Sequence, residues 1–129
     1  MQKGIDVVWC QVTDMSRAVA FYRDVLGFEL VEESPYWSQF KVSESLGLGL
    51  HPTIEKANGP SGKRYGNWSI TIAVDDLLAC KAKLEAAGAK THGFDEIEGY
   101  ATLLEFQDLD DNPMQLAQHG ATKASLGVE

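Results

Sequence analysis

The chain carries the same local pattern twice, about sixty residues apart. Val-Thr-Asp-Met at residues 12–15 opens one amphipathic stretch, and Val-Asp-Asp-Leu at residues 74–77 opens another at an offset of 62 residues. The first stretch ends in Leu-Gly-Phe at residues 26–28 and the second in Ala-Gly-Ala at residues 87–89, an offset of 61 residues. Because the offset falls from 62 to 61 between the two ends, the second copy has lost one residue in a helix turn or its cap. The chain is therefore predicted to contain two copies of one strand-helix-strands unit.

Length limits how these copies can be arranged. A chain of 129 residues with 44% hydrophobic content fills one core well but is too short for two independent cores. We therefore expect a single domain spanning residues 1–129 with an internal repeat. Its parts are a first module at about 5–52, a linker at 53–67, a second module at about 68–118, and a tail at 119–129 that is expected to fray.

The charge balance argues against nucleic-acid binding. The formal net charge is −8, and the 11 Lys and Arg residues are scattered rather than gathered in the basic stripe that displaces counterions from phosphates. Acidic clusters occur at residues 32–33, 95–98 and 108–111. Their first interpretation is solubility, and attraction of a cationic ligand is the alternative if a pocket proves acidic as well.

Two further exclusions concern membranes and disulfides. No apolar run approaches the length of a membrane span, and residues 1–6 lack the pattern of a signal peptide, so a soluble cytoplasmic protein is expected. Cys10 and Cys80 lie in apolar-patterned segments without metal-type spacing. They are interpreted as reduced, buried thiols with no functional signal.

The first copy is predicted to fold as βαβββ. Residues 5–12 are β-branched and aromatic, as in a strand, and Asp14 stands where a helix N-cap is expected. Apolar residues at helical spacing follow until Gly27, which offers a left-handed stop. Three short strands are predicted after it, at 28–33, 36–42 and 46–51.

The second copy repeats this order after a segment rich in Gly and Pro. Residues 52–67 have neither helical nor strand periodicity and are predicted to link the copies, with a possible role as a lid. Strands are expected at 68–74, 89–94, 100–107 and 114–118, and a helix capped by Asp75 or Asp76 ends at Gly88. The Asp-rich segment 108–113 is predicted to be the last hairpin turn.

Strand alternation assigns side chains to the two faces of the predicted sheets. In the segment 46–51 the leucines point toward the helices, so Gly47, Gly49 and His51 point away from them. The same alternation places Trp68, Leu104, Phe106, Met114 and Leu116 in the core. The opposite face of the sheets carries small, polar and aromatic side chains, which suit a ligand cleft on a twisted sheet. The residues predicted to bind the ligand there are Val7, Trp9, Gly49, His51, Ser69, Thr71, Glu105 and Gln115.

These residues carry a resemblance to a known superfamily. The segment from Val12 to Phe28, with its Phe-Tyr-x-x-x-Leu-Gly helix end, and the Asp-rich last turn at 108–113 resemble the vicinal oxygen chelate superfamily. This group includes glyoxalase I, the bleomycin resistance proteins and the extradiol dioxygenases. The resemblance covers residues 5–118 and implies an α+β fold of two tandem βαβββ modules that form an open barrel-like cleft, commonly in a homodimer.

The resemblance also implies where a metal would be bound. Enzymes of the superfamily hold a divalent metal with His or Glu at four places, which correspond here to Val7, Gly49, Ser69 and Gln115. Valine and glycine have no side-chain donor, a serine hydroxyl is a poor ligand for Zn, Ni or Fe, and a lone amide oxygen cannot hold such a metal. We therefore predict no metal centre and no cofactor, and consider glyoxalase I and dioxygenase activities disfavoured.

Two residues on the predicted cleft face keep a catalytic alternative open. His51 lies one pleat beyond Gly49, so a displaced metal site using His51, Glu105 and Gln115 is an alternative to a hydrogen-bonding wall residue. Glu105 is the candidate catalytic residue, because a carboxylate in a partly apolar cleft can act as a base. The competing interpretation is a solvated carboxylate at the cleft mouth.

Aromatic residues point to the kind of ligand. Trp9 and one member of the Tyr36-Trp37 pair are predicted to face away from the core, where they suit a flat organic molecule, cationic or neutral, or, equally well, a dimer interface. The favoured hypothesis is a metal-free small-molecule binding protein of the bleomycin-resistance type, with its ligand in clefts formed across a homodimer. The alternative is a glyoxalase-like lyase or isomerase, or a dioxygenase-related enzyme, with a rearranged metal site or with Glu105 as base.

Overall fold

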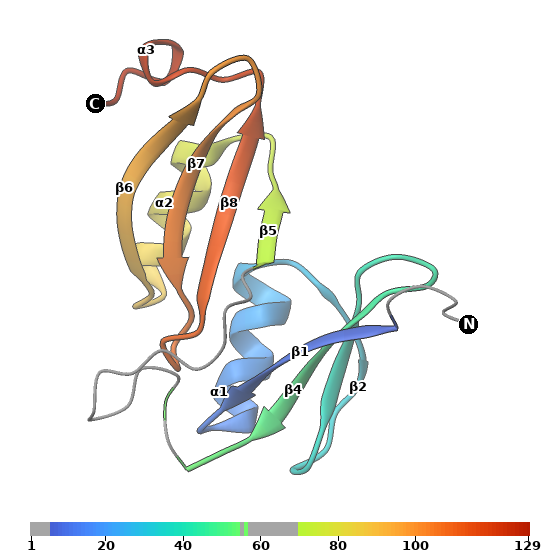
Figure 1. Cartoon of the computed structure of the whole chain (residues 1–129). Coiled ribbons are helices and arrows are strands. Elements are labelled where there is room, and N and C mark those ends of the chain that lie inside the picture. The colour runs from blue at the N-terminus through green and yellow to red at the C-terminus, as the bar shows by residue number, and fades with distance from the viewer. Residues whose placement is uncertain (1–5, 55, 57–69) are drawn as a thin grey trace. The chain divides into compact units, whose positions relative to one another are not determined.

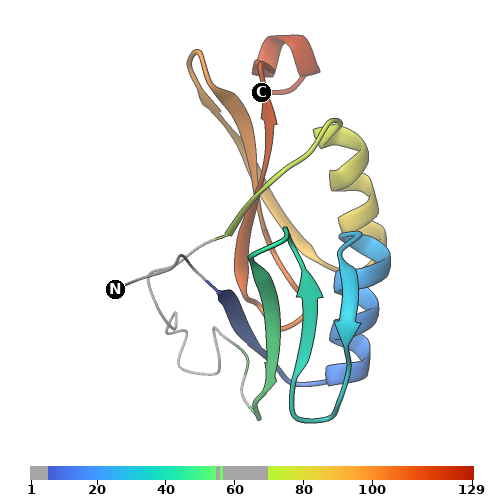
Figure 2. The ribbon, with the colours of Figure 1, turned by 90° about the vertical axis from the view of Figure 1, so that its right-hand side faces the viewer.

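The computed structural model describes residues 6–54, 56 and 70–129, which form two similar modules. The chain divides into compact units at Met1–Arg64 and Tyr65–Glu129. Each unit holds one mixed four-stranded sheet with a helix on one face (Figures 1 and 2). The α+β fold of two tandem βαβββ modules is thus confirmed, while the predicted strand at 68–74 and linker at 53–67 lie partly outside the described residues.

Module 1 consists of β1 (Val7–Val12), α1 (Met15–Ala20), a π-helical turn η1 (Phe21–Val25), β2 (Glu29–Glu32), β3 (Ser38–Lys41) and β4 (Gly47–Pro52). The strand order is β1-β4-β3-β2, with β1 parallel to β4 and the other pairs antiparallel. Module 2 repeats this plan with β5 (Ile70–Ala73), α2 (Leu77–Ala86), β6 (Lys90–Ile97), β7 (Ala101–Gln107) and β8 (Pro113–His119) in the order β5-β8-β7-β6. The internal repeat read from the sequence is therefore also a repeat of topology.

Both helices begin at the aspartates that the sequence indicates. Asp14 accepts a hydrogen bond from the Arg17 backbone N–H at 3.1 Å, and Asp76 accepts one from Ala79 at 3.0 Å. Of the two candidates for the second cap, Asp76 is thus the N-cap, because its side chain satisfies a backbone donor of the first turn. Gly27 and Gly88 follow the helix ends with φ of +82° and +86°, a conformation that favours glycine.

The one-residue difference between the repeats lies in η1. The Leu26 N–H donates to the Phe21 carbonyl at 3.1 Å, a five-residue step that holds one residue more than an α-helical turn. A π turn accommodates a single inserted residue without shifting the rest of the helix. The buried stripe of Ala18, Val19 and Tyr22 therefore stays in register against the sheet.

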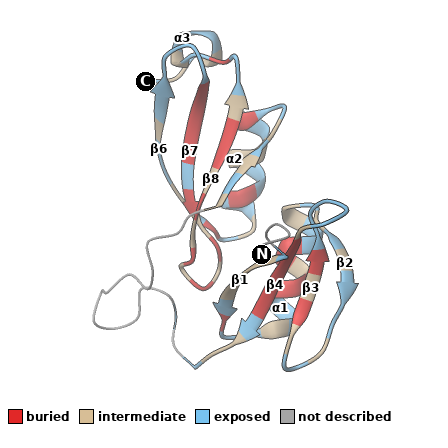
Figure 3. Ribbon diagram, turned by 45° about the vertical axis from the view of Figure 1, so that its right-hand side comes forward, coloured by how far each residue is buried: buried red, intermediate tan, exposed pale blue. Residues whose placement is uncertain are grey.

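The cores follow the predicted alternation. In module 1, Val12, Phe40 and Leu50 are fully buried, and in module 2 the buried set includes Leu77, Leu84 and the strand residues Leu104, Phe106, Met114 and Leu116. Figure 3 shows these buried segments along β3, β4 and β7. Trp68, which was expected in the core, lies outside the described residues.

The acidic segment 108–111 is not the solvated surface that a solubility role requires. Asp108 is 3% exposed and Asp110 is 1% exposed. The Asp108 carboxylate accepts hydrogen bonds from the backbone N–H groups of Asp110 and Asn112 at 2.9 and 2.8 Å and from Asn112 Nδ2 at 2.9 Å. The solubility interpretation is therefore wrong for this cluster, which builds the turn between β7 and β8.

Two smaller expectations need correction. The tail expected to fray contains a short helix, α3 (Lys123–Leu126), whose N-cap Thr122 and Ser125 form a reciprocal capping box. Cys10 and Cys80 are thiols, as expected, but they are only half-buried, and Cys10 Sγ lies 3.4 Å from the Tyr22 hydroxyl. No helix within the described residues is long and apolar enough to cross a membrane.

Candidate functional site

The face of the first sheet that points away from α1 is built around two glycines of β4. Gly49 lies between Trp9 of β1 and Gln39 of β3 in the strand register, and Gly47 lies between Val7 and Lys41. A strand with glycine at alternate positions leaves a side-chain-free track on one face of the sheet. Neighbouring side chains fill this track.

Trp37 lies directly on Gly49. A Cβ atom built on Gly49 would come within 2.2 Å of Trp37 Cη2, a distance that no real side chain tolerates. Gln39 covers Gly47 in the same manner, since a Cβ atom on Gly47 would lie 2.6 Å from Gln39 Nε2. The Trp37 indole N–H donates to Gln39 Oε1 at 3.1 Å, so that the two side chains form one hydrogen-bonded unit.

A tight turn before β3 fixes the backbone of Trp37. The Ser34 hydroxyl accepts from the Trp37 backbone N–H at 3.1 Å and donates to the Trp37 carbonyl at 3.0 Å. The Ser34 backbone N–H donates to the same carbonyl at 3.1 Å. Trp37 is therefore held at its backbone by Ser34 and at its ring by Gln39, while its neighbour Tyr36 is 79% exposed.

Trp9 and His51 complete an aromatic cluster with Trp37. The ring centroids of Trp9 and Trp37 are 6.5 Å apart with planes at 58°, and those of Trp9 and His51 are 5.8 Å apart at 54°. Trp9 is 54% exposed, which is unusual for a side chain of its size. The prediction that Trp9 faces away from the core is confirmed by this exposure.

His51 has one ring nitrogen engaged. Its Nδ1 lies 2.8 Å from the Pro52 carbonyl oxygen, and because a carbonyl only accepts, Nδ1 carries the proton. The second ring nitrogen, Nε2, then bears a lone pair in the neutral imidazole. On an exposed residue this atom is a hydrogen-bond acceptor for a bound molecule.

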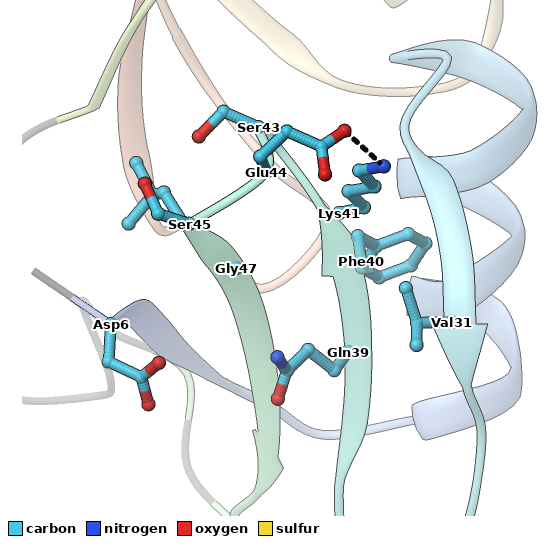
Figure 4. Close-up of a pocket in the computed structure, with 10 residues that line it drawn as sticks. Asp6, Val31, Gln39, Phe40, Lys41, Ser43, Glu44, Ser45 and Gly47 are labelled. Atoms are coloured by element: carbon cyan, nitrogen blue, oxygen red, sulfur yellow. Dashed lines mark hydrogen bonds and ion pairs between the residues drawn. The ribbon is translucent and has the colours of Figure 1, made fainter.

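A depression of about 250 Å³ lies next to this cluster, toward the turn between β3 and β4. Gln39 and Gly47 form part of its floor, and its polar lining comes from Asp6, Lys41, Ser43, Glu44 and Ser45 (Figure 4). Lys41 Nζ and Glu44 Oε1 form an ion pair at 3.0 Å across its rim. Sequence reasoning did not predict this depression, because its walls come from a turn.

Module 2 presents a row of polar side chains on the corresponding face of its sheet. The Thr71 hydroxyl donates to Gln115 Oε1 at 3.1 Å, and Gln115 Nε2 donates to Glu105 Oε1 at 3.4 Å. These three predicted residues, on β5, β8 and β7, are thus brought together. Glu105 is exposed, which matches a solvated carboxylate better than a desolvated base. Ser69 lies outside the described residues.

The same face of module 2 is less polar than expected. Leu103 is only 9% exposed and forms a small buried cluster with Ala101 and Ala117. Strand register pairs Leu103 with Ala117, directly beside the pair of Glu105 and Gln115. The polar row therefore adjoins an apolar patch.

Comparison with known proteins identifies the family. The model of the Glyoxalase/Bleomycin resistance protein/Dioxygenase superfamily matches residues 4–116. The chain belongs to this superfamily. Among curated proteins, it is 29% identical to a lactoylglutathione lyase of Haemophilus influenzae, in an alignment covering 91% of this chain and 93% of the relative.

Solved structures of the superfamily share the fold. TnmS3, an antibiotic-binding protein of Streptomyces sp. CB03234, is similar with a TM-score of 0.68 and 22% identity over 92% of this chain and 98% of that chain. The fosfomycin resistance protein FosX of Listeria monocytogenes, solved with Mn(II) and sulfate, is similar with a TM-score of 0.75 and 17% identity over 98% of both chains. The same fold thus occurs in an antibiotic-binding protein and in a protein solved with a metal ion.

The donor set of this chain does not fit the superfamily's metal. The positions that the family resemblance assigns to metal ligands are Val7, Gly49, Ser69 and Gln115, of which two have no side-chain donor atom and one is an amide already engaged with Thr71 and Glu105. Trp37 also takes the space that a ligand side chain at position 49 needs. Within residues 6–54, 56 and 70–129, no three His, Cys, Asp or Glu side chains gather into a group that could hold a metal ion.

Two side chains of module 1 were missed as site residues by sequence reasoning. Trp37 was assigned only as one of a pair, and Gln39 was not considered. The alternate glycines of the segment 46–51 could have indicated these two residues. A strand with glycine at every second position has no side chains on one face, which makes room for large side chains from neighbouring strands.

Proposed function

We propose that this chain is a metal-free small-molecule binding protein of the superfamily, which holds an organic ligand by stacking and hydrogen bonds. The observation that carries the proposal is the aromatic cluster of exposed Trp9 and His51 with half-buried Trp37, beside a depression on the glycine track. Indoles held on a sheet face provide large contact area at little entropic cost. The likeness of fold to the antibiotic-binding protein TnmS3 is in keeping with this role.

The proposal assigns ligand contacts on each sheet. On module 1 these are Val7, Trp9, Gly49 and His51, to which Trp37 and Gln39 are added. On module 2 they are Thr71, Glu105 and Gln115, with Ser69 retained from the sequence. The homodimer and the cytoplasmic location also remain part of the proposal, on the strength of the family resemblance and the sequence.

A thermal-shift screen tests this function. The protein is melted with a panel of small organic molecules, antibiotics included, in buffer containing EDTA. We expect at least one compound to raise Tm with EDTA present, because a ligand that binds only the folded state stabilises it by mass action. Trp9→Leu should abolish the shift and Tyr100→Leu, a change of another exposed aromatic, should leave it intact.

A lyase is the second candidate, favoured by the 29% identity to the Haemophilus influenzae protein. Such an enzyme needs either a rearranged metal site using His51, Glu105 and Gln115 or a metal-independent base at Glu105. Assay for lactoylglutathione lyase activity with and without added Ni, Zn, Mn and Fe separates the candidates. Loss of turnover in both His51→Ala and Glu105→Gln would support the rearranged metal site. Loss of turnover in Glu105→Gln alone would support Glu105 as a metal-independent base.

A further inference from the structure

The aromatic cluster and the depression of module 1 are parts of one surface, joined at Gln39. This side chain accepts the Trp37 indole N–H at 3.1 Å through Oε1, and it also lines the depression. Gly47 lies beneath Gln39 and Gly49 beneath Trp37, and the two glycines are on the same face of β4. A molecule lying on the Trp37 ring therefore reaches the depression over the Gln39 amide.

The two ends of this surface have different chemistry. One end presents the indoles of Trp9 and Trp37, whose π faces attract flat rings and cations. At the other end, the described lining residues supply the carboxylates of Asp6 and Glu44 and one ammonium group, that of Lys41. Lys41 pairs with Glu44 at 3.0 Å, and among the described residues that line the depression the carboxylate of Asp6 is one negative charge in excess.

We propose that module 1 recognises a planar aromatic ring that carries an amine. The ring stacks on Trp37 with Trp9 at its side, and the ammonium group enters the depression and is attracted by Asp6. Trp37 is the specificity-determining residue of this surface. The inference rests on the proposed small-molecule function and names its ligand class.

The way in which Trp37 is held explains why this side chain, rather than an exposed aromatic elsewhere, sets the preference. Its backbone is fixed by Ser34 and its ring by Gln39, and Gly49 lets the ring lie against the strand. A ring already held in the binding geometry loses little conformational entropy when a ligand stacks on it. The net charge of −8 adds a long-range attraction for cations.

Calorimetric titration with three simple probes tests the ring and the charge separately. The probes are 1-naphthylmethylamine, which has both; 1-naphthylacetate, which has the ring with the opposite charge; and cyclohexylmethylamine, which has the amine without a planar π system. Each is titrated into the full chain and into the Trp37→Leu and Asp6→Asn variants, with Tyr100→Leu as a control for loss of an exposed aromatic elsewhere. Circular dichroism verifies that each variant is folded.

We expect 1-naphthylmethylamine to bind at least about tenfold more tightly than either other probe, since stacking and charge each contribute. Trp37→Leu should weaken its binding by about tenfold and Asp6→Asn by about threefold, while Tyr100→Leu leaves it unchanged. Equal affinities for the three probes, or no effect of Trp37→Leu in a folded variant, would overturn the proposal.

Three further outcomes separate this inference from the proposed function. If the naphthyl amine fails while compounds of another class raise Tm in the screen, the ligand class is wrong and the binding function stands. If no compound binds at all, both fail. If Trp37→Leu instead converts a dimer to a monomer in sedimentation, the surface is an interface between copies and the inference is overturned.

Discussion

The indole of Trp37 occupies the space that any side chain at Gly49 would need. A Cβ atom at Gly49 would lie 2.2 Å from both Cη2 and Cζ2 of Trp37. The family resemblance assigns a metal ligand to position 49, so a ligand side chain there and the observed Trp37 would exclude each other. At this position a ligand side chain has neither a donor atom nor the space to be placed.

The close approach predicts strong coupling between these two positions. Gly49→Ala should destabilise the protein by about 1–3 kcal/mol, because a rigid ring must be displaced. In a Trp37→Ala background the same change should cost little, since the clash is gone. Urea unfolding of the four proteins of the double-mutant cycle measures the coupling.

Gly47→Ala provides the matched control for that cycle. The atoms nearest to its Cβ would all belong to Gln39, with Nε2 at 2.6 Å and Cδ at 3.2 Å, and this flexible side chain can turn away. We expect a smaller cost than for Gly49→Ala. Additive effects of Gly49→Ala and Trp37→Ala would show that the indole does not rest on the strand in solution.

The buried turn of module 2 predicts a large effect of a small change. Asp108→Asn replaces an acceptor that takes three hydrogen bonds, and its new amide group would face the Asn112 amide, a donor. The expected loss is about 1–3 kcal/mol of the free energy of unfolding. Asp95→Asn, at an exposed strand position, should change it by less than about 0.5 kcal/mol. Equal effects of the two substitutions would mean that the Asp108 contacts contribute nothing.

The helix caps predict a contrast between adjacent aspartates. Asp76→Ala removes the hydrogen bond to Ala79 and should cost about 1 kcal/mol, as should Asp14→Ala in module 1. Asp75→Ala should be close to neutral, because the Asp75 side chain is not the cap. Thermal and urea unfolding measure all three, and a larger cost for Asp75→Ala would contradict the assignment of Asp76 as N-cap.

Thiol reactivity of Cys80 tests the environment of α2. Burial, helped by the negative charge of Asp76, raises the pKa of the Cys80 thiol, whereas Lys83 acts in the opposite direction. A raised pKa means less thiolate at a given pH, so alkylation by iodoacetamide at about pH 8.5 should be slower for Cys80 than for a cysteine in a short peptide. Lys83→Gln should slow it further. Mass spectrometry of the Cys80 peptide gives the rate, and alkylation as fast as in the peptide would contradict the raised pKa.

The sequence was informative where local chemistry decides the structure. The spacing of apolar residues, the aspartate caps and the glycine stops predicted both βαβββ modules. Strand alternation placed Leu50, Phe106 and Leu116 in the core and Trp9 outside it. The one-residue mismatch between the repeats was visible, although its solution as the π turn at Phe21–Val25 was not.

Other features depend on contacts that no local pattern encodes. The position of the Trp37 ring depends on its packing against Gly49 of β4. The burial of Asp108 depends on the path of the turn that folds around its carboxylate. The base role of Glu105 was a hypothesis about burial, and the exposed position of this side chain beside Gln115 gives it no support. In each case the environment, and not the residue type, decides the chemistry.

The central claim, ligand binding without a metal centre, is tested most directly by elemental analysis of the full chain. The protein is produced in medium supplemented with Ni, Zn, Mn and Fe, purified without chelator, and analysed alongside the His51→Ala and Glu105→Gln variants. The account predicts that bound metal is substoichiometric and equal in all three proteins. One equivalent of a transition metal in the wild type, lost in both variants, would contradict it.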